Sequence, residues 1–429
     1  MTADPGSTDF ESVDYFTSDA FVRDPYPYYE FVRSKGPAWR EPHQGVVMVT
    51  GYEEATEVLR DADRYSSCNA VTGPFPGFPV PLEGDDVSEL IALHRDKLPM
   101  HDQLPTLDPP VHGKHRALLM RLLTPNRLKE NEEFMWRIVD RQLDEFLDSG
   151  RCEFLADYAQ PFAMLVIADL LGVPEEDRED FRAHLTSGRR TGIGSTNTKA
   201  MAHNPLEYLY GRFTEYIEDR RRSPREDVLT SLAQATFPDG SLPEPIDVVR
   251  VASNLFAAGQ ETTVRLLVAS LQILAERQDL QQQLRADSGR IPNFVEEALR
   301  FESPVKGDFR LTRVPTTIGG VDIPAGTTVM VLLGAVNRDP GRFEDAGTFD
   351  PERRNARQQM AFGLGVHSCP GGPLARTETR ISLDRILSRM GEIRIDEAEH
   401  GPENARRYDY APTFILRGLQ RLHLTFDAS

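Results

Sequence analysis

The stretch best suited to chemistry is a short loop that carries one cysteine between glycines. Residues 362–371 read FGLGVHSCPG, and a helix is expected to begin near Pro373. The glycines permit backbone conformations and close contacts that larger residues disfavour. A cysteine beside the start of a helix lies near backbone N–H groups and the helix dipole, and both favour the thiolate form. Cys369 is therefore placed to bind the metal of a large, flat cofactor lying against the loop.

Two simpler roles compete for this cysteine. An isolated cysteine is more often a small buried apolar residue than a ligand. Zinc is the other metal option, but zinc sites combine several cysteine or histidine ligands at characteristic spacings. The sequence has no Cys-x-x-Cys pair and no second cysteine near residue 369. The loop therefore favours the metal of a cofactor over zinc.

The overall composition narrows the class of protein. The chain has 429 residues, of which 39% are hydrophobic and 27% charged, and this balance is typical of a folded protein with a substantial core. Its net charge of −18 argues against nucleic acid and anionic membranes as partners. Three cysteines cannot build a disulfide framework, which fits the reducing cytoplasm. We expect no secretory signal, no membrane span and a cytoplasmic protein.

A long helix expected over about 247–277 has an unusual centre, AAGQETT at 257–263. Glycine inside a helix costs about 1 kcal/mol relative to alanine, and threonine hydroxyls compete for backbone carbonyls. This centre is therefore either a local distortion, as we expect, or an ordinary core helix that tolerates one glycine. One face of the helix is small at Ala258 and Gly259, which leaves room for a ligand. The residues spaced to lie on that face are Val251, Asn254, Leu255, Ala258 and Thr262.

A basic segment at 111–129 stands out in this acidic chain because it contains no acidic residue. It is either a solvated helix face or a docking surface for an acidic partner. Its cations are Lys114, Arg116, Arg121, Arg127 and Lys129.

The remaining elements are expected around two long loops. Residues 1–24 are expected to form a flexible tail, and the proline-rich stretch at 72–84 and the polar stretch at 188–204 are interpreted as lids. Further helices are expected over 28–34, 53–60, several segments of 131–235, and 373–390. Strands are expected over 46–50, 316–323, 327–333, 393–395, 413–416 and 422–426.

Four motifs occur in an order and spacing that resemble the soluble bacterial cytochromes P450. They are Ala-Gly-x-Glu-Thr-Thr at 258–263, Glu297-x-x-Arg300, the aromatic-Asp-Pro-Glu-Arg run at 349–353, and the cysteine loop. The loop matches the family's haem signature at Phe362, Gly363, Gly365, His367, Cys369 and Gly371. The resemblance covers the chain from about Pro25. It implies a mainly α fold with small β-sheets, a single haem domain at 25–429, and haem b buried between the long helix and the helix after the cysteine.

The resemblance also implies roles for individual residues. Cys369 is the expected axial thiolate, whose electron donation weakens the O–O bond. Thr262 and Glu261 match the acid–alcohol pair that relays protons during oxygen activation. Glu297, Arg300 and Arg353 are expected to form a structural triad. The other expected haem contacts are His112, Arg116, Ala258, Gly259, Arg310, Phe362, Gly363, His367 and Gly371.

Electrons are expected to come singly from NAD(P)H through a reductase and an acidic ferredoxin. The ferredoxin is expected to dock on the basic face on the cysteine side of the haem. The cations expected there are Arg116, Arg121, Arg127, Lys129, Arg376 and Arg380. One position departs from the family pattern: Pro370 follows the cysteine where leucine is most usual. Proline has no backbone N–H, so this position offers the sulfur no hydrogen bond.

The function expected from this resemblance is a monooxygenase that hydroxylates a hydrophobic terpenoid, steroid or aromatic compound. A peroxide-driven peroxygenase of the same fold is one alternative, although such enzymes typically carry arginine and proline where this chain has Glu261 and Thr262. A haem protein that binds a ligand without turnover is the other. We expect a monomer. The expected pocket residues are Val251, Asn254, Leu255, Ala258, Val305, Phe309 and Phe414.

Overall fold

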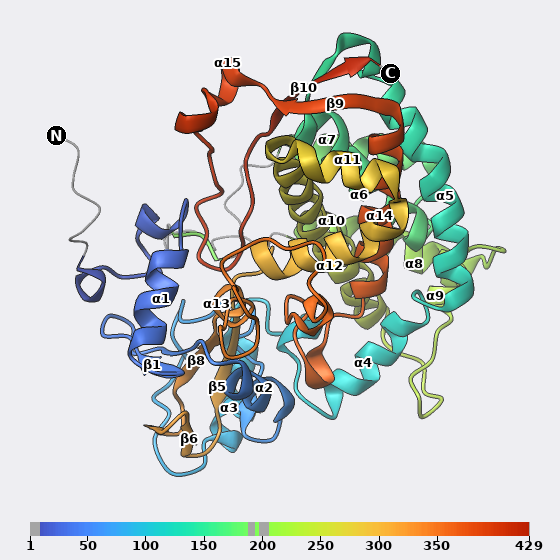
Figure 1. Cartoon of the computed structure of the whole chain (residues 1–429). Coiled ribbons are helices and arrows are strands. Elements are labelled where there is room, and N and C mark those ends of the chain that lie inside the picture. The colour runs from blue at the N-terminus through green and yellow to red at the C-terminus, as the bar shows by residue number, and fades with distance from the viewer. Residues whose placement is uncertain (1–8, 188–193, 197–205, 429) are drawn as a thin grey trace.

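A long central helix organises the fold, with shorter helices packed around it (Figure 1). The computed structural model describes residues 9–187, 194–196 and 206–428. The central helix is α10 (Pro245–Glu276), which packs against α4, α6, α8, α12 and α14. The other described α-helices are α1 (Tyr26–Ser34), α2 (Tyr52–Arg60), α3 (Ser88–His94), α4 (Val111–Met120), α5 (Pro125–Asp144), α6 (Gln160–Leu171), α7 (Arg178–Ser187), α8 (Glu207–Arg222), α9 (Val228–Ala233), α11 (Gln278–Ala286), α12 (Ile291–Glu302), α13 (Leu333–Val336), α14 (Gly372–Arg389) and α15 (Glu397–His400). None of the described helices is both long and apolar enough to cross a membrane.

Helix α10 runs without interruption through its unusual centre, so the expected distortion does not break it. The Thr262 hydroxyl donates to the carbonyl oxygen of Ala258 at 2.8 Å, which satisfies this polar side chain within the helix. Gly259 lies against α6, where a Cβ atom would be 3.1 Å from Ile167 Cδ1. Hydrogen bonding and close helix packing therefore offset the low helix propensity of this sequence.

Three small sheets complete the described fold. The largest has the order β1-β2-β8-β5-β3, and in it β2 (Val47–Val49) pairs in parallel with β8 (Thr328–Val331). This pairing joins the two halves of the sequence. The other strands are β1 (Ala38–Arg40), β3 (Tyr65–Ser66), β4 (Arg151–Glu153), β5 (Asp308–Thr312), β6 (Thr316–Ile318), β7 (Val321–Ile323), β9 (Met390–Ile395) and β10 (His423–Ala428). The strand expected at 413–416 is wrong, because this segment forms only isolated bridges at Thr413 and Leu416.

The expected flexible tail ends earlier than residue 24. Tyr15, Phe16 and Phe21 are buried, and the Tyr15 ring stacks on Tyr28 with centroids 5.0 Å apart. Residues 9–24 thus belong to an aromatic cluster, and the boundary at residue 24 is corrected. Aromatic side chains bury large areas, so they hold this otherwise polar segment in place. Residues 1–8 lie outside the described part.

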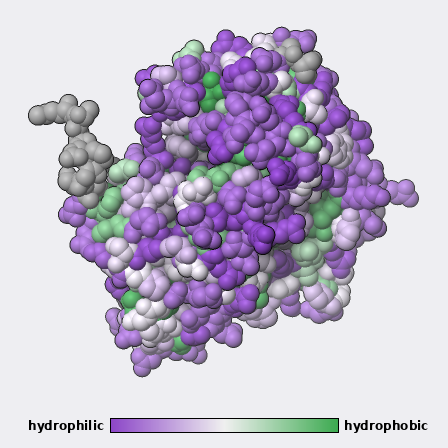
Figure 2. Space-filling model, in the orientation of Figure 1, coloured by the Kyte–Doolittle hydropathy of each residue, from purple (hydrophilic) through white to green (hydrophobic). Residues whose placement is uncertain are grey.

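The proline-rich loop at 72–84 is anchored by apolar side chains. Phe75 packs edge-on against Phe16 and Phe414, while Phe78 and Leu82 pack against a second buried cluster. The other expected lid, at 188–204, lies outside the described residues except for 194–196. There the Phe414 N–H donates to the Gly194 carbonyl at 2.8 Å. The face seen in Figure 2 is mostly hydrophilic with small scattered apolar patches, as the high charge content predicts.

Candidate active site

The cysteine loop is braced between α2 and the start of α14. The Cys369 N–H donates to the Phe362 carbonyl at 2.8 Å, which closes the loop on itself. Gly365 has a φ of +70°, and a Cβ atom there would lie 2.5 Å from the carbonyl oxygen of Leu59. Only glycine fits this close approach. The loop geometry therefore depends on the glycine pattern seen in the sequence.

Cys369 differs from the other two cysteines in its surroundings. It is exposed, whereas Cys68 and Cys152 are buried. Desolvation by the surrounding protein raises the pKa of the Cys369 thiol, while the N–H groups of Gly371 and Gly372 and the charge of Arg116 act in the opposite direction. Burial raises the pKa of Cys68 to about 11, so that side chain stays a thiol. Of the three, Cys369 is the sulfur with both access and stabilising donors.

Four basic side chains gather beside this sulfur. The rings of His112 on α4 and His367 in the loop lie 4.1 Å apart, and Arg116 donates to the Ser368 carbonyl at 2.7 Å. Burial lowers the pKa of His112 to about 4, with further lowering by the charge of Arg116. Arg310 on β5 also lowers the pKa of His112 and His367 by its charge.

This cluster fits the acidic edge of a flat cofactor. The Nε2 atom of His367 is buried and has no hydrogen-bond partner among the described residues. Arg310 pairs with Asp308 at 2.6 Å, so a carboxylate already approaches one member of the cluster. Basic groups and an unused buried nitrogen next to an exposed thiol match the needs of haem b, whose two propionates are acidic and whose iron accepts a thiolate.

The acid and alcohol of α10 lie on a part of the helix that side chains leave open. Ala258 and Glu261 are exposed and Thr262 is partly exposed, although most of α10 is buried. The carboxylate of Glu261 pairs with Arg265 at 2.5 Å, one turn further along the helix. The hydroxyl of Thr262 bonds back to Ala258. An exposed acid and an adjacent hydroxyl can pass protons between solvent and a reacting group.

Glu297, Arg300 and Arg353 form one buried ion-pair network. Arg300 binds both carboxylate oxygens of Glu297 at 2.7 Å, and Arg353 reaches the same carboxylate at 3.1 Å. The side chains of Glu297 and Arg300 are completely buried. Arg300 also donates to the carbonyls of Asn337, Ala346 and Thr348. The network thereby holds the meander before the cysteine loop against α12.

Comparison with known proteins assigns the family. The cytochrome P450 family model matches residues 195–390. Cytochrome P450 144 of Mycobacterium tuberculosis is 32% identical over 94% of this chain and 89% of its own length. The monooxygenase PikC of Streptomyces venezuelae is 33% identical over 94% of this chain and 91% of its own. The chain belongs to the cytochrome P450 family.

Solved cytochromes P450 share the fold. Mycobacterium marinum cytochrome P450 CYP150A6, in the substrate-free form, is 57% identical, covers 98% of this chain and 100% of its own, and has a TM-score of 0.92. CYP109E1 of Bacillus megaterium in complex with testosterone is 26% identical, covers 94% of this chain and 100% of its own, and has a TM-score of 0.75. The chain is accordingly an oxidoreductase of the monooxygenase family, which uses haem b and receives electrons from NAD(P)H through redox partners.

The expected pocket residues do not form one group in this cytochrome P450. Val251 and Leu255 are part of the main core, whereas Phe309 and Phe414 belong to the aromatic cluster that includes Phe16. Side chains alternate along a strand, so Phe309 and Arg310 point to opposite faces of β5. Phe309 is buried in the aromatic cluster on the face opposite Arg310, and its expected place in the substrate pocket stays a prediction. Val305 is partly buried against the aromatic cluster, and Asn254 and Ala258 remain on the α10 face.

The expected basic docking face is largely paired within the protein. Arg376 binds Glu296 at 2.6 Å and Arg380 binds Glu132 at 2.5 Å. Arg127 pairs with Asp169 and Glu130, and Arg121 donates to the Thr236 carbonyl. The segment is also two helices, α4 and α5, rather than one. Since internal carboxylates offset Arg127, Arg376 and Arg380, three of the six expected cations, the face is less positive than the isolated segment predicts.

Sequence reasoning missed Lys306, a lysine buried beside the aromatic cluster. Its side chain is only 3% exposed, and its ammonium group donates to the Thr413 carbonyl at 2.6 Å. Burial lowers the pKa of Lys306 to about 7, and the charges of Arg417 and Arg265 lower it further. Its position between Val305 and Gly307, just before β5, gave no periodic signal of burial.

Lys306 is expected to make the stability of the protein depend on pH. Above pH 7 the folded lysine is neutral, while the unfolded one stays protonated up to its ordinary pKa of 10.5. The unfolded state then binds more protons, so the free energy of unfolding rises with pH by about 1.4 kcal/mol per unit. Lys306→Met removes this rise, so its stability relative to the wild type should fall by roughly 2 kcal/mol between pH 7 and pH 9. Urea unfolding at both pH values measures the difference.

The exposed Lys129→Met variant is the control and should follow the wild type at both pH values. Parallel pH dependence for Lys306→Met and the wild type would contradict a lowered pKa for Lys306. The variant also loses the hydrogen bond to Thr413 at both pH values, so the change in stability between the two pH values is the quantity compared.

Proposed function

We propose that this cytochrome P450 is a haem-thiolate monooxygenase in which the Cys369 thiolate would hold the haem iron. The observation that carries the proposal is the exposed Cys369 sulfur next to four gathered basic side chains. When bound, haem b supplies the iron at which dioxygen is activated. The chain is proposed to act as a single haem domain in the cytoplasm, and residues 9–24 pack onto that domain.

The residues around Cys369 hold and tune the cofactor. The Gly371 and Gly372 N–H groups favour the thiolate, in opposition to the desolvation that raises the pKa of the Cys369 thiol overall. Arg116, Arg310, His112 and His367 bind the two propionates. Burial and the charges of these two arginines lower the pKa of both histidines. The negative charge of bound propionates would offset the repulsion among these basic groups.

Thr262 and Glu261 on α10 are proposed to transfer protons to the reacting group. Thr262 presents a hydroxyl that would pass a proton to the reacting group once it leaves the Ala258 carbonyl. Glu261 is exposed, and it resupplies that hydroxyl from solvent. An intact acid–alcohol pair argues against the peroxide-driven alternative, and an accessible sulfur with a proton path argues against a haem protein that only binds ligands.

The substrate is proposed to be a hydrophobic terpenoid, steroid or aromatic compound. The open face of α10 carries Ala258 and the partly buried Asn254, which offer space and one polar contact. The solved structure of the related CYP109E1 is in complex with testosterone, which supports a steroid as one candidate. Specificity depends on the few polar groups that a mostly apolar pocket presents.

A ferredoxin is proposed to deliver the electrons on the cysteine side. Lys129 and Arg121 remain exposed there, and neither is in a carboxylate pair among the described residues. The affinity of an acidic ferredoxin for these exposed cations would fall strongly as the salt concentration rises.

The test is the difference spectrum of the dithionite-reduced holoprotein with and without carbon monoxide. A red-shifted Soret band is expected from a thiolate-ligated haem. A histidine-type band, or failure to bind haem, would refute the assignment of Cys369. Consumption of NADH with a purified reductase and ferredoxin then separates a monooxygenase from a binding protein.

A further inference from the structure

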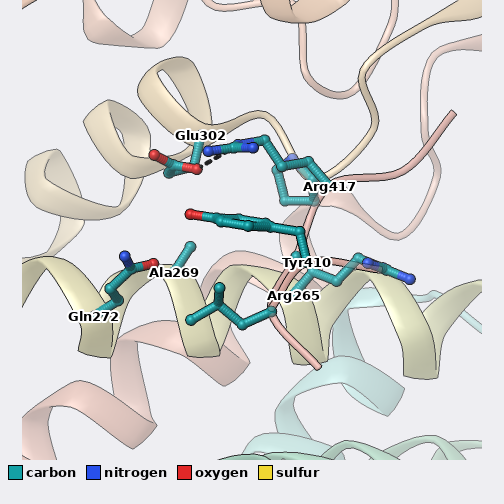
Figure 3. A pocket seen from close by; sticks show the side chains of 9 residues that line it. Arg265, Ala269, Gln272, Glu302, Tyr410 and Arg417 are labelled. Carbon is teal, nitrogen blue, oxygen red and sulfur yellow. Dashed lines mark hydrogen bonds and ion pairs between the residues drawn. The ribbon is translucent and has the colours of Figure 1, made fainter. Parts of the chain in front are cut away.

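Arg265 connects the proposed proton-carrying acid to a buried polar cluster further along α10. Its guanidinium pairs with Glu261 at 2.5 Å, and its side chain lines a small cavity with Gln272, Glu302 and Tyr410. Figure 3 shows Arg265 on α10 below the ring of Tyr410, with its guanidinium directed away from the pair formed by Glu302 and Arg417. The cavity is about 10 Å³, close to the space of one water molecule.

The two members of the Glu261–Arg265 pair differ sharply in freedom. The side chain of Arg265 is 11% exposed, whereas that of Glu261 is 52% exposed. Arg265 is also confined by the backbone of Gly418, where a Cβ atom would lie 2.7 Å from Arg265 Cγ. The arginine is therefore the fixed partner, and the carboxylate is the one that can rotate.

The charges around Arg265 make it depend on this carboxylate. Arg417 is committed to Glu302 at 2.8 Å and is covered by the Tyr410 ring, 4.2 Å from its guanidinium. The charges of Arg417 and Arg265 both act on Lys306, so the three basic side chains lie close to one another. Among the described residues, Glu261 is the carboxylate in ion-pair contact with Arg265. A nearly buried cation among other cations strongly favours keeping its partner.

We propose that Arg265 is a positioning residue that holds the Glu261 carboxylate on α10 within reach of Thr262. The inference rests on the proposed function, in which Glu261 resupplies the Thr262 hydroxyl with protons. A glutamate followed by an arginine at i+4 is the favourable order for such a pair on a helix. Without the arginine, an exposed carboxylate one residue from Thr262 rotates into solvent and is less often in place for proton transfer.

The structural test compares crystal structures of the holoenzyme with those of Arg265→Met and Arg265→Lys. The Glu261 carboxylate should leave its wild-type position in Arg265→Met and keep it in Arg265→Lys. Arg265→Gln is a second neutral variant in case the methionine variant does not fold. An unchanged Glu261 position in a neutral variant would overturn the inference without reference to any substrate.

The functional test measures hydrogen peroxide released and product formed per NADH consumed, with testosterone as the probe. Arg265→Met should lower product per NADH by roughly 3- to 10-fold, and Arg265→Lys should restore most of it. Arg277→Met, which removes an exposed arginine–aspartate pair at the end of α10, is the matched control and should behave as the wild type. Wild-type coupling in Arg265→Met overturns the positioning role.

Glu261→Gln separates this inference from the proposed function. If Glu261→Gln impairs coupling and Arg265→Met does not, the acid has its proposed role but Arg265 does not position it. If Glu261→Gln couples as the wild type does, the acid role itself fails, and the role of Arg265 fails with it.

Discussion

Replacing Cys369 by histidine is expected to abolish the red-shifted Soret band of the reduced carbon monoxide complex. It should also lower monooxygenase activity by at least about 100-fold, because an imidazole donates less electron density to the iron than a thiolate does. The loop itself should persist, since its closing hydrogen bond uses the Cys369 backbone N–H and its glycines brace it against α2. Reduced difference spectra and NADH-driven turnover measure the two effects.

The matched control for this variant is Cys152→Ala. Cys152 is also a free cysteine, but it is buried on β4, and burial raises its pKa far above the ordinary value. Its loss should leave the spectrum unchanged. A red-shifted band that survives in Cys369→His, or disappears in Cys152→Ala, would assign the iron ligand to another group and remove the basis of the proposed mechanism.

The site could be predicted from sequence where its chemistry is local. The glycine pattern at 362–371 encodes the conformation of a segment only ten residues long. The pattern shows that the backbone must approach something closely at Gly365, but only the structure shows that the partner is Leu59. The pairing of Glu297 with Arg300 follows from their spacing on one helix. The long helix and most short helices were likewise predicted within a few residues.

The errors concern contacts between segments far apart in the chain. The tail at 9–24 is polar overall, and only the partners of Tyr15 and Phe16 in other segments explain why it packs. The basic segment keeps its charge in the sequence, but carboxylates such as Glu132 and Glu296 neutralise its neighbours in space. The burial of Phe309 likewise depends on distant segments, because its ring packs against Phe16 and Phe414. The net charge of a surface and the burial of a side chain depend on contacts between distant segments, and the sequence of one segment does not reveal those contacts.

Replacing Arg300 by methionine is expected to destabilise the protein more than any other single change considered for this fold. The guanidinium uses all its N–H groups, bonding Glu297 and three backbone carbonyls of the meander. Without it, the Glu297 carboxylate is left fully buried with Arg353 as its remaining cationic partner at 3.1 Å. Breaking a buried pair in this way costs about 3–5 kcal/mol. The expected result is a strong loss of folded, haem-binding protein, measured by the urea unfolding midpoint and by haem content after purification.

Two further variants make this expectation specific to the fork of Arg300. Arg300→Lys keeps the positive charge but cannot bind two oxygens of Glu297 and three carbonyls together, so it should recover only part of the stability. Arg290→Met removes the exposed pair with Glu352 just before the same helix, and it should change the free energy of unfolding by less than about 1 kcal/mol. Equal stability of Arg300→Met and Arg290→Met would mean that the network does not hold the meander. In that case the cysteine loop, which follows the meander directly, must owe its position to its own glycines and to α14 alone.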